Sequence, residues 1–91
     1  MSSYRIGYRF EKRVQKYLQS QGWFVFRQGK SAFPDLICLK PGLVRLIECK
    51  VNRRQFSRGE RERMIEISRR TGAETYLAYR EKHKIKFEAV K

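Results

Sequence analysis

Negative charge is scarce in this sequence. Nine Asp and Glu residues stand against 22 Lys and Arg, which gives the 91 residues a formal net charge of +13. Self-repulsion of this size destabilises an isolated compact chain, so we expect a polyanion to relieve it. Nucleic acid is the leading candidate, because each neutralised phosphate releases condensed counterions. A generally basic protein, bound to ribosomes or taken from a thermophile, is the plainer alternative.

Long apolar runs are also missing. No stretch approaches the roughly 20 apolar residues that a membrane-spanning helix needs. The residues after Met1 lack the apolar core of a secretory signal. We therefore expect no membrane partner, and a location in the cytoplasm, at the nucleoid or at a viral replication site.

Residues that form disulfides or bind zinc are few. The two cysteines, Cys38 and Cys49, and the single histidine, His83, lack the spacing of a structural zinc site. Two cysteines make no disulfide framework either. Both lie in apolar runs, which predicts buried free thiols in a reducing compartment.

Hydrophobic periodicity predicts a single domain over residues 1–91. Repeats, low-complexity tracts and linkers are absent. The predicted elements are a helix over 4–20, strands over 23–27, 36–39 and 43–51, a helix over 58–71, and strands over 74–79 and 84–89. The order α-β-β-β-α-β-β predicts an α/β fold, in which helices pack against a mixed sheet.

Local signals indicate how two of these elements begin and end. Ser57 and Glu60 match a capping box at the start of the second helix, and Gly72 closes that helix. Pro41 cannot adopt the positive φ of a primed two-residue hairpin turn. We therefore expect a wider loop between the second and third strands.

Two of the few carboxylates occur in apolar strands. Asp35 opens one strand and Glu48 lies inside the next. An unpaired carboxylate in such a place costs on the order of several kcal/mol unless a partner or a cation compensates it. We expect Leu39 to pair with Val44 across the loop between the strands. Strand alternation then brings Asp35 opposite Glu48 on one face, with Lys50 projecting from the same face.

Two carboxylates and a lysine at a strand end suit metal-assisted hydrolysis of a phosphodiester. Carboxylates that face each other repel, and a Mg²⁺ ion between them removes the repulsion and accepts a substrate phosphate as a further ligand. The ion generates or positions hydroxide, and a lysine beside it orients the water or stabilises negative charge in the transition state. The structural alternative is an ordinary salt bridge between Lys50 and Glu48 or Asp35.

Glu11 lies at the edge of the apolar stripe of the first helix, beside Leu18 and Gly7. The basic residues of this helix line the opposite side. An acid on the buried edge, away from its cationic neighbours, is placed to complete a metal site, and this is the role that we favour. The alternative is a border residue that reaches out to an arginine.

Five segments together resemble a known nuclease family. They are FPDLI at 33–37, IECK at 47–50, GYRFE at 7–11, GKS at 29–31 and GAETYLA at 72–78. The first two are similar to the paired motifs of the PD-(D/E)xK restriction-endonuclease-like nucleases, and the others resemble the archaeal-type Holliday junction resolvases of that superfamily. The resemblance implies a restriction-endonuclease-like fold, with a central mixed five-stranded sheet flanked by helices.

This resemblance implies an endonuclease that depends on Mg²⁺, with Mn²⁺ able to substitute, and that acts as a homodimer. It would bind a four-way DNA junction and nick opposing strands symmetrically, leaving 5′-phosphates. The chain is shorter than typical cellular resolvases, which would fit a minimal viral or plasmid-borne version.

The site residues follow from the same resemblance. Asp35 and Glu48 would bind Mg²⁺ together with the backbone carbonyl of Cys49. Lys50 would position the attacking water, and Glu11 would assist through the metal or its water.

Basic residues near the loops are the expected DNA contacts. Contacts with phosphates position a substrate without reading its sequence, which suits recognition of a branched shape. The candidates are Arg27, Lys30, Arg53, Arg54 and Arg58, with Arg5 and Arg9 on the first helix. Ser31 matches a family serine that contacts the DNA backbone near the cut. For each basic residue, a solvated surface charge is the alternative.

Two other functions stay open at this point. One is a related nuclease of the virus-type replication-repair group, which acts on flaps or other branched DNA. The other is a DNA-binding module without catalysis. The presence of Asp35, Glu48 and Lys50 argues against the second, because the two carboxylates repel each other and the DNA.

Overall fold

The computed structural model describes residues 3–29 and 32–91. Within these residues the chain forms two α-helices, a short 3₁₀ helix and five strands. Their bounds are α1 Ser3–Ser20, β1 Phe24–Arg27, β2 Leu36–Lys40, β3 Leu43–Lys50, η1 Arg53–Gln55, α2 Arg58–Thr71, β4 Glu74–Glu81 and β5 Lys84–Ala89. The predicted order of helices and strands is confirmed, and η1 is an addition to it. None of the described helices has both the length and the apolar character needed to cross a membrane.

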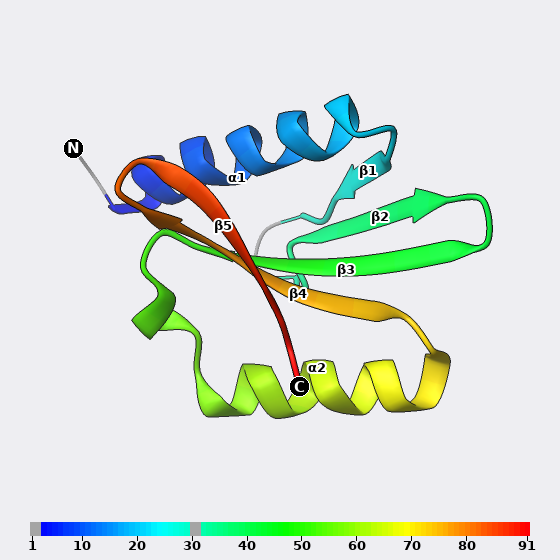
Figure 1. Cartoon of the computed structure of the whole chain (residues 1–91). Helices are drawn as coiled ribbons and strands as arrows, with labels where there is room; N and C mark the ends of the chain where they lie inside the picture. Colours follow the sequence, from blue (N-terminus) through cyan, green and yellow to red (C-terminus); the bar gives the residue numbers. More distant parts are fainter. Residues whose placement is uncertain (1–2, 30–31) are drawn as a thin grey trace.

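The strands form a mixed sheet in the order β1-β2-β3-β4-β5 (Figure 1). Neighbouring strands are antiparallel except β3 and β4, which are parallel. This parallel pair needs a long crossover, and η1 and α2 supply it. The predicted register between β2 and β3 is confirmed, since Leu39 pairs with Val44.

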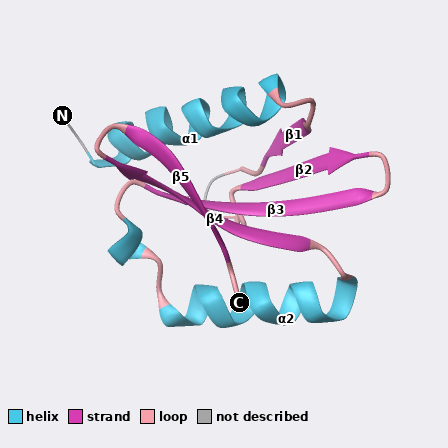
Figure 2. Cartoon of the chain, in the orientation of Figure 1, coloured by secondary structure: helices cyan, strands magenta, loops and turns pink. Residues whose placement is uncertain are grey.

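The two helices cover opposite faces of the sheet, which gives three layers (Figure 2). On one face Phe10, Val14 and Leu18 of α1 pack against sheet residues that include Leu36 and Ile47. On the other face the core surrounds Met64 of α2, which is fully buried, and contains Leu46 and Leu77 from the sheet. Strand alternation explains this division, because Leu46 and Ile47 are neighbours in β3 and point to opposite faces.

Helix α2 begins and ends at the predicted residues. The Ser57 hydroxyl accepts a hydrogen bond from the N–H of Glu60, and the Glu60 carboxylate accepts one from the N–H of Ser57. At the other end Gly72 adopts the left-handed conformation with φ 79°, where glycine avoids the steric cost of a Cβ. The capping-box prediction is therefore confirmed.

The loop between β2 and β3 is shorter than predicted. Lys40 pairs with Leu43, which leaves only Pro41 and Gly42 in the turn. The positive φ, 74°, falls on Gly42, and a turn of this kind accepts proline in its first position. The prediction of a wider loop was wrong because it assumed a primed turn, in which the first residue needs a positive φ.

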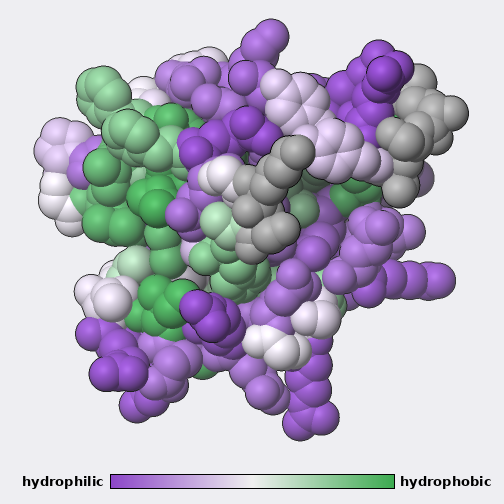
Figure 3. Space-filling model, turned by 180° about the vertical axis from the view of Figure 1, so that it is seen from behind, coloured by the Kyte–Doolittle hydropathy of each residue, from purple (hydrophilic) through white to green (hydrophobic). Residues whose placement is uncertain are grey.

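Apolar side chains are exposed near this turn, on the face of the sheet that α2 covers further along. Phe24 and Phe26 of β1 are 71% and 56% exposed, and Leu39 and Val44 lie beside them. We call these four residues the apolar patch. Figure 3 shows hydrophobic surface gathered on the side of the molecule that carries the turn. Edge strand β1 thus presents phenyl rings to solvent where most edge strands are protected.

Candidate active site

The ladder between β2 and β3 continues through side chains where its backbone pairs end. The last backbone pair is Leu36 with Ile47. One residue further, the N–H of Asp35 donates to Oε1 of Glu48 at 3.1 Å, and the N–H of Cys49 donates to Oδ2 of Asp35 at 2.8 Å. The structure thus brings Asp35 and Glu48 together as the register predicted.

Burial and mutual repulsion make it costly for both carboxylates to be ionised. Glu48 is 5% exposed, and burial together with the charge of Asp35 raises its pKa from 4.5 to about 8. Burial also raises the pKa of Asp35, and the charge of Glu11 adds to the rise, although the hydrogen bond from Cys49 opposes it. A cation beside the pair would favour the ionised forms of both groups.

Lys50 supplies one such cation. Its Nζ lies 3.4 Å from Oε2 of Glu48 and 2.9 Å from Oε2 of Glu60. Burial would lower the pKa of Lys50, but the hydrogen bond to Glu60 and the charges of both glutamates outweigh it and raise the pKa. The salt bridge that was the structural alternative is therefore present, and Glu60 is a partner that the sequence analysis missed.

Gln28 holds the segment that leads into Asp35. Its backbone N–H donates to the carbonyl of Asp35 at 3.0 Å, and its side-chain Nε2 donates to the carbonyl of Pro34 at 2.7 Å. Two bonds from one residue at the end of β1 thus orient the Pro34–Asp35 segment. This residue too was missed, because a lone glutamine after a strand carries no recognisable signal.

Glu11 lies on the sheet side of α1 and is paired with an arginine. Its Oε2 accepts a hydrogen bond from Nε of Arg27, and the Arg27 guanidinium also lies 4.9 Å from the centre of the Tyr8 ring. Its side chain is 15% exposed, and its charge reaches Asp35. The pairing with an arginine, which was the alternative to a role in the metal site, is thus present. Glu11 also lies near enough to Asp35 for its charge to raise the pKa of that carboxyl.

The remaining candidate DNA contacts occupy several surfaces. Arg53 forms an ion pair with Glu88, and Arg58 forms one with Glu62. Arg54 is exposed after the end of β3, and Arg5 and Arg9 are exposed on α1. Lys30 and Ser31, which were also predicted as site residues, lie outside the described residues.

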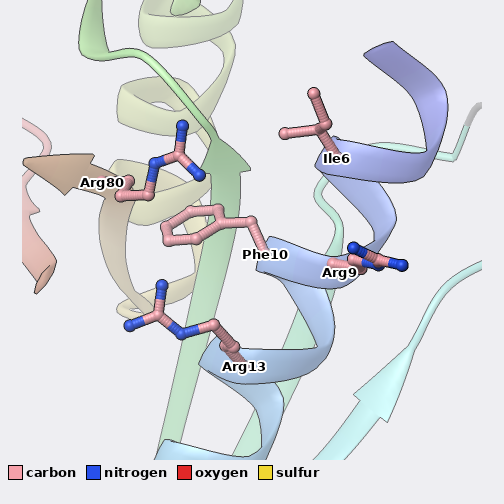
Figure 4. Close-up of a pocket in the computed structure, with 5 residues that line it drawn as sticks. All are labelled: Ile6, Arg9, Phe10, Arg13 and Arg80. Atoms are coloured by element: carbon pink, nitrogen blue, oxygen red, sulfur yellow. The ribbon is translucent and has the colours of Figure 1, made fainter. Parts of the chain in front are cut away.

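Two arginines that the sequence analysis did not select line a cavity beside α1. The cavity has a volume of about 370 Å³ and is lined by Ile6, Arg9, Phe10, Arg13 and Arg80. Arg13 and Arg80 lie on either side of the Phe10 ring, whereas Arg9 points away from it (Figure 4). The N–H of Arg80 donates to the carbonyl of Val51, just beyond Lys50. A positive cavity therefore adjoins the end of β3 that carries the carboxylates.

The carboxylate pair suits magnesium better than a metal held entirely by side chains. Among residues 3–29 and 32–91, no three His, Cys, Asp or Glu side chains form a metal-binding group. Mg²⁺ commonly binds through one or two carboxylates and completes its shell with water and substrate phosphate. The Cys49 thiol is a poor ligand because burial raises its pKa well above 9.0, which leaves its backbone carbonyl as the available group. The donor set therefore fits Mg²⁺.

Two comparisons of the sequence match this chain to known proteins. Residues 2–91 match the family model described as archaeal Holliday junction resolvase (Hjc). The crossover junction endodeoxyribonuclease Hjc of Methanocaldococcus jannaschii is 32% identical over 78 residues, which are 82% of this chain and 59% of that protein. This chain therefore spans less than two thirds of the length of that relative.

A solved structure shows the same fold. Hjc of Archaeoglobus fulgidus, a Holliday junction resolvase from an archaeal hyperthermophile, matches with a TM-score of 0.74 at 26% identity. The match covers 92% of this chain and 72% of that one. The predicted restriction-endonuclease-like architecture is thereby confirmed.

Proposed function

Because the chain belongs to the archaeal Holliday junction resolvase family, we propose that it is a metal-dependent endonuclease that resolves four-way DNA junctions. It would nick opposing strands symmetrically by phosphodiester hydrolysis and leave 5′-phosphates. The observation that carries the proposal is the pairing of half-buried Asp35 with buried Glu48, with Lys50 beside them, on a chain of net charge +13. A DNA substrate would place the protein in the cytoplasm, at the nucleoid or at a viral replication site.

In this proposal Asp35, Glu48 and the backbone carbonyl of Cys49 bind Mg²⁺, and Mn²⁺ substitutes. The bound ion would supply an activated water and offset negative charge as the phosphodiester is attacked. The two carboxylates have a reason to bind a cation, because burial raises the pKa of both and the charge of Asp35 adds to the rise at Glu48.

The chain's own groups would orient the reaction around this pair. Lys50 carries an ammonium at the edge of the site, where it would hold the attacking water or donate to a phosphate oxygen. Glu11, fixed by Arg27, would assist from the α1 side through the metal or its water. Ser31 would contact the DNA backbone near the cut, as the family resemblance implies.

The DNA would lie across the end of the sheet where these groups meet. Phosphate contacts from basic side chains would position a branched substrate without reading its sequence. The proposed contacts are Arg5, Arg9, Arg27, Lys30, Arg53, Arg54 and Arg58, to which the structure adds Arg13 and Arg80 as candidates. Some are engaged in ion pairs, such as Arg53 with Glu88, and DNA phosphates would compete for these.

A homodimer would present two such sites to the two strands that are cut. The apolar patch supports this arrangement, because Phe24 and Phe26 expose contiguous apolar surface beside Leu39 and Val44. On small soluble proteins, contiguous exposed apolar surface commonly marks a site of protein–protein contact. A second copy of the chain on this patch would bury the rings and leave the carboxylate end of the hairpin open to DNA.

A comparison of three substrates tests the proposal directly. A synthetic four-way junction, a flap and a linear duplex are incubated with the protein and Mg²⁺, and the products are resolved on a denaturing gel. We expect paired nicks in the junction and little cutting of the duplex. Asp35→Asn and Glu48→Gln should abolish cutting while junction binding survives.

Each contrary result points to a particular error. Cutting by either variant at the wild-type rate would show that the metal site is assigned to the wrong residues. Equal cutting of flaps and junctions would favour the related replication-repair nuclease. Junction binding without cutting by the wild type, in Mg²⁺ and in Mn²⁺, would indicate a non-catalytic binding module.

A further inference from the structure

Glu60 serves two elements at once through the two oxygens of one carboxylate. Its Oε1 accepts a hydrogen bond from the backbone N–H of Ser57 at 2.9 Å and so closes the capping box of α2. Its Oε2 accepts a hydrogen bond from Nζ of Lys50 at 2.9 Å. The sequence motif accounts for the first bond and says nothing of the second.

The second bond decides where the Lys50 ammonium lies. Lys50 ends β3, and its Nζ sits between Oε2 of Glu48 from its own strand and Oε2 of Glu60 from α2. The side chains of Lys50 and Glu60 are 22% and 26% exposed, so water screens this pair less than a surface pair. The ammonium is thus held from two directions at the edge of the carboxylate site.

A lysine needs such support because its stem is flexible. Four rotatable bonds leave the ammonium many positions, and a charge that must meet a developing negative charge acts best when it is already in place. The Glu60 carboxylate is itself held, because the backbone N–H of Ser57, which any residue at that position keeps, donates to its Oε1. The cap of α2 therefore provides a fixed anchor for a mobile side chain.

We propose that Glu60 is a positioning residue that holds the Lys50 ammonium at the catalytic site, an inference that rests on the proposed nuclease function. A carboxylate has two acceptor oxygens and an amide has one. The two bonds use different oxygens of Glu60, so glutamine in the same orientation keeps the capping box and turns an NH₂ group, which cannot accept, toward Lys50. This difference allows the two roles of Glu60 to be separated.

Glu60→Gln and Ser57→Ala form the matched pair that makes this separation. Glu60→Gln should lower the single-turnover rate of junction cutting by about 10- to 100-fold, with junction Kd changed by less than about twofold and Tm close to that of the wild type. Ser57→Ala loses the side-chain cap and should lower Tm by several degrees while the cutting rate stays within about twofold. Glu66→Gln, on the exposed face of the same helix and paired with Arg69 and Arg70, controls for the loss of a charge.

A second background tests whether Glu60 acts through Lys50. In Lys50→Met, the further change Glu60→Gln should have no additional effect on the cutting rate, since the group that it positions is gone. Additive losses in the double variant would overturn the proposal. A wild-type rate in folded Glu60→Gln would overturn it too, as would a loss of cutting in Ser57→Ala as large as that in Glu60→Gln.

An NMR measurement keeps this inference distinct from the nuclease assignment. The side-chain ammonium signal of Lys50 should be observable in the wild type, and in Glu60→Gln it should broaden and shift as the group becomes mobile. If the wild type cuts no DNA but this change is seen, the nuclease proposal fails and the anchoring of Lys50 stands. An unchanged signal in Glu60→Gln would refute the anchoring, whatever the wild type cuts.

Discussion

At one end of the β2–β3 hairpin carboxyl groups are shielded from water, and at the other end apolar side chains are exposed to it. At the open end Asp35 and Glu48 place two acids beside each other, and Glu48 is almost inaccessible to water. At the turn end, on the same face, Leu39 and Val44 are exposed beside Phe24 of β1. One face of the hairpin thus carries shielded carboxyl groups at one end and exposed apolar side chains at the other.

This contrast indicates that each end is completed by a different partner. Buried carboxylates that repel each other are stabilised by a cation, and exposed contiguous apolar surface is stabilised by another apolar surface. The proposed metal and DNA would stabilise the carboxylates, and the proposed second copy would cover the apolar surface. The hairpin joins the two ends, so the position of a partner copy would set the position of each site.

Removal of the Lys50 ammonium tests the function of the open end. Lys50→Met keeps the apolar stem but leaves Glu48 and Glu60 without their shared cation. We expect the rate of junction cutting to fall on the order of 10³-fold, measured in single turnover with junction affinity followed separately. Lys40→Met, at the turn end of the same hairpin, should cut at close to the wild-type rate. Similar losses in both variants would mean that the two ends do not differ in function.

The turn end is tested by making the patch polar without adding charge. Phe24→Ser combined with Phe26→Ser removes two exposed rings from each copy, and should raise the dimer dissociation constant by about 100-fold or more. Sedimentation equilibrium measures this change, and the paired nicks should become independent single nicks. Tyr4→Ser, an exposed aromatic residue on α1, is the matched control. A double variant that stays dimeric would place the interface elsewhere.

The stability of the chain should depend on pH through Glu48 at the open end. The folded chain holds the Glu48 proton to about pH 8, whereas an unfolded glutamate loses it near 4.5. Without metal, the free energy of unfolding should therefore fall as the pH rises between these values, by at most about 5 kcal/mol. Denaturant titrations in EDTA measure it, with Glu48→Gln as the reference. Addition of Mg²⁺ should flatten the fall, and an equal slope in Glu48→Gln would assign it to other groups.

The position of the DNA relative to the two ends can be tested with one arginine and one lysine. Arg80→Ala removes a guanidinium beside the end of β3 and should weaken junction binding severalfold. The slope of log Kd against log salt should fall by about one if a phosphate contact is lost. Lys40→Ala removes a charge at the turn end, where Lys40 lies over Trp23, and should leave affinity and slope nearly unchanged. The reverse result would move the DNA to the turn end.

Most of the fold was predictable because its signals are local. The Ser57–Glu60 capping box and Gly72 mark α2 by backbone chemistry that needs no distant contact. The pairing of Leu39 with Val44 followed from strand alternation, and it brought Asp35 opposite Glu48. The sequence has one aspartate and a few glutamates, so an acid in an apolar strand stood out.

What was missed depends on contacts between elements. The bond from Lys50 to Glu60 joins β3 to α2 across η1, and no spacing in the sequence encodes the direction in which that helix approaches. Gln28 is another example, since its contact with Pro34 depends on where β1 ends beside β2. The prediction of a wider loop at Pro41 failed for a different reason. It considered only primed turns and so excluded the turn type that occurs.

The two hydrogen bonds from backbone amides to carboxylates at the open end of the hairpin have a practical consequence for spectroscopy. The amide protons of Asp35 and Cys49 donate directly to the two carboxylates, so their resonances respond to the charge on those oxygens. Two backbone signals in a ¹⁵N-edited spectrum therefore act as built-in reporters of protonation and ligation. They need no label at the site and no substitution of the groups under observation. The occupancy of the site can thus be followed in the unaltered protein, before any DNA is added.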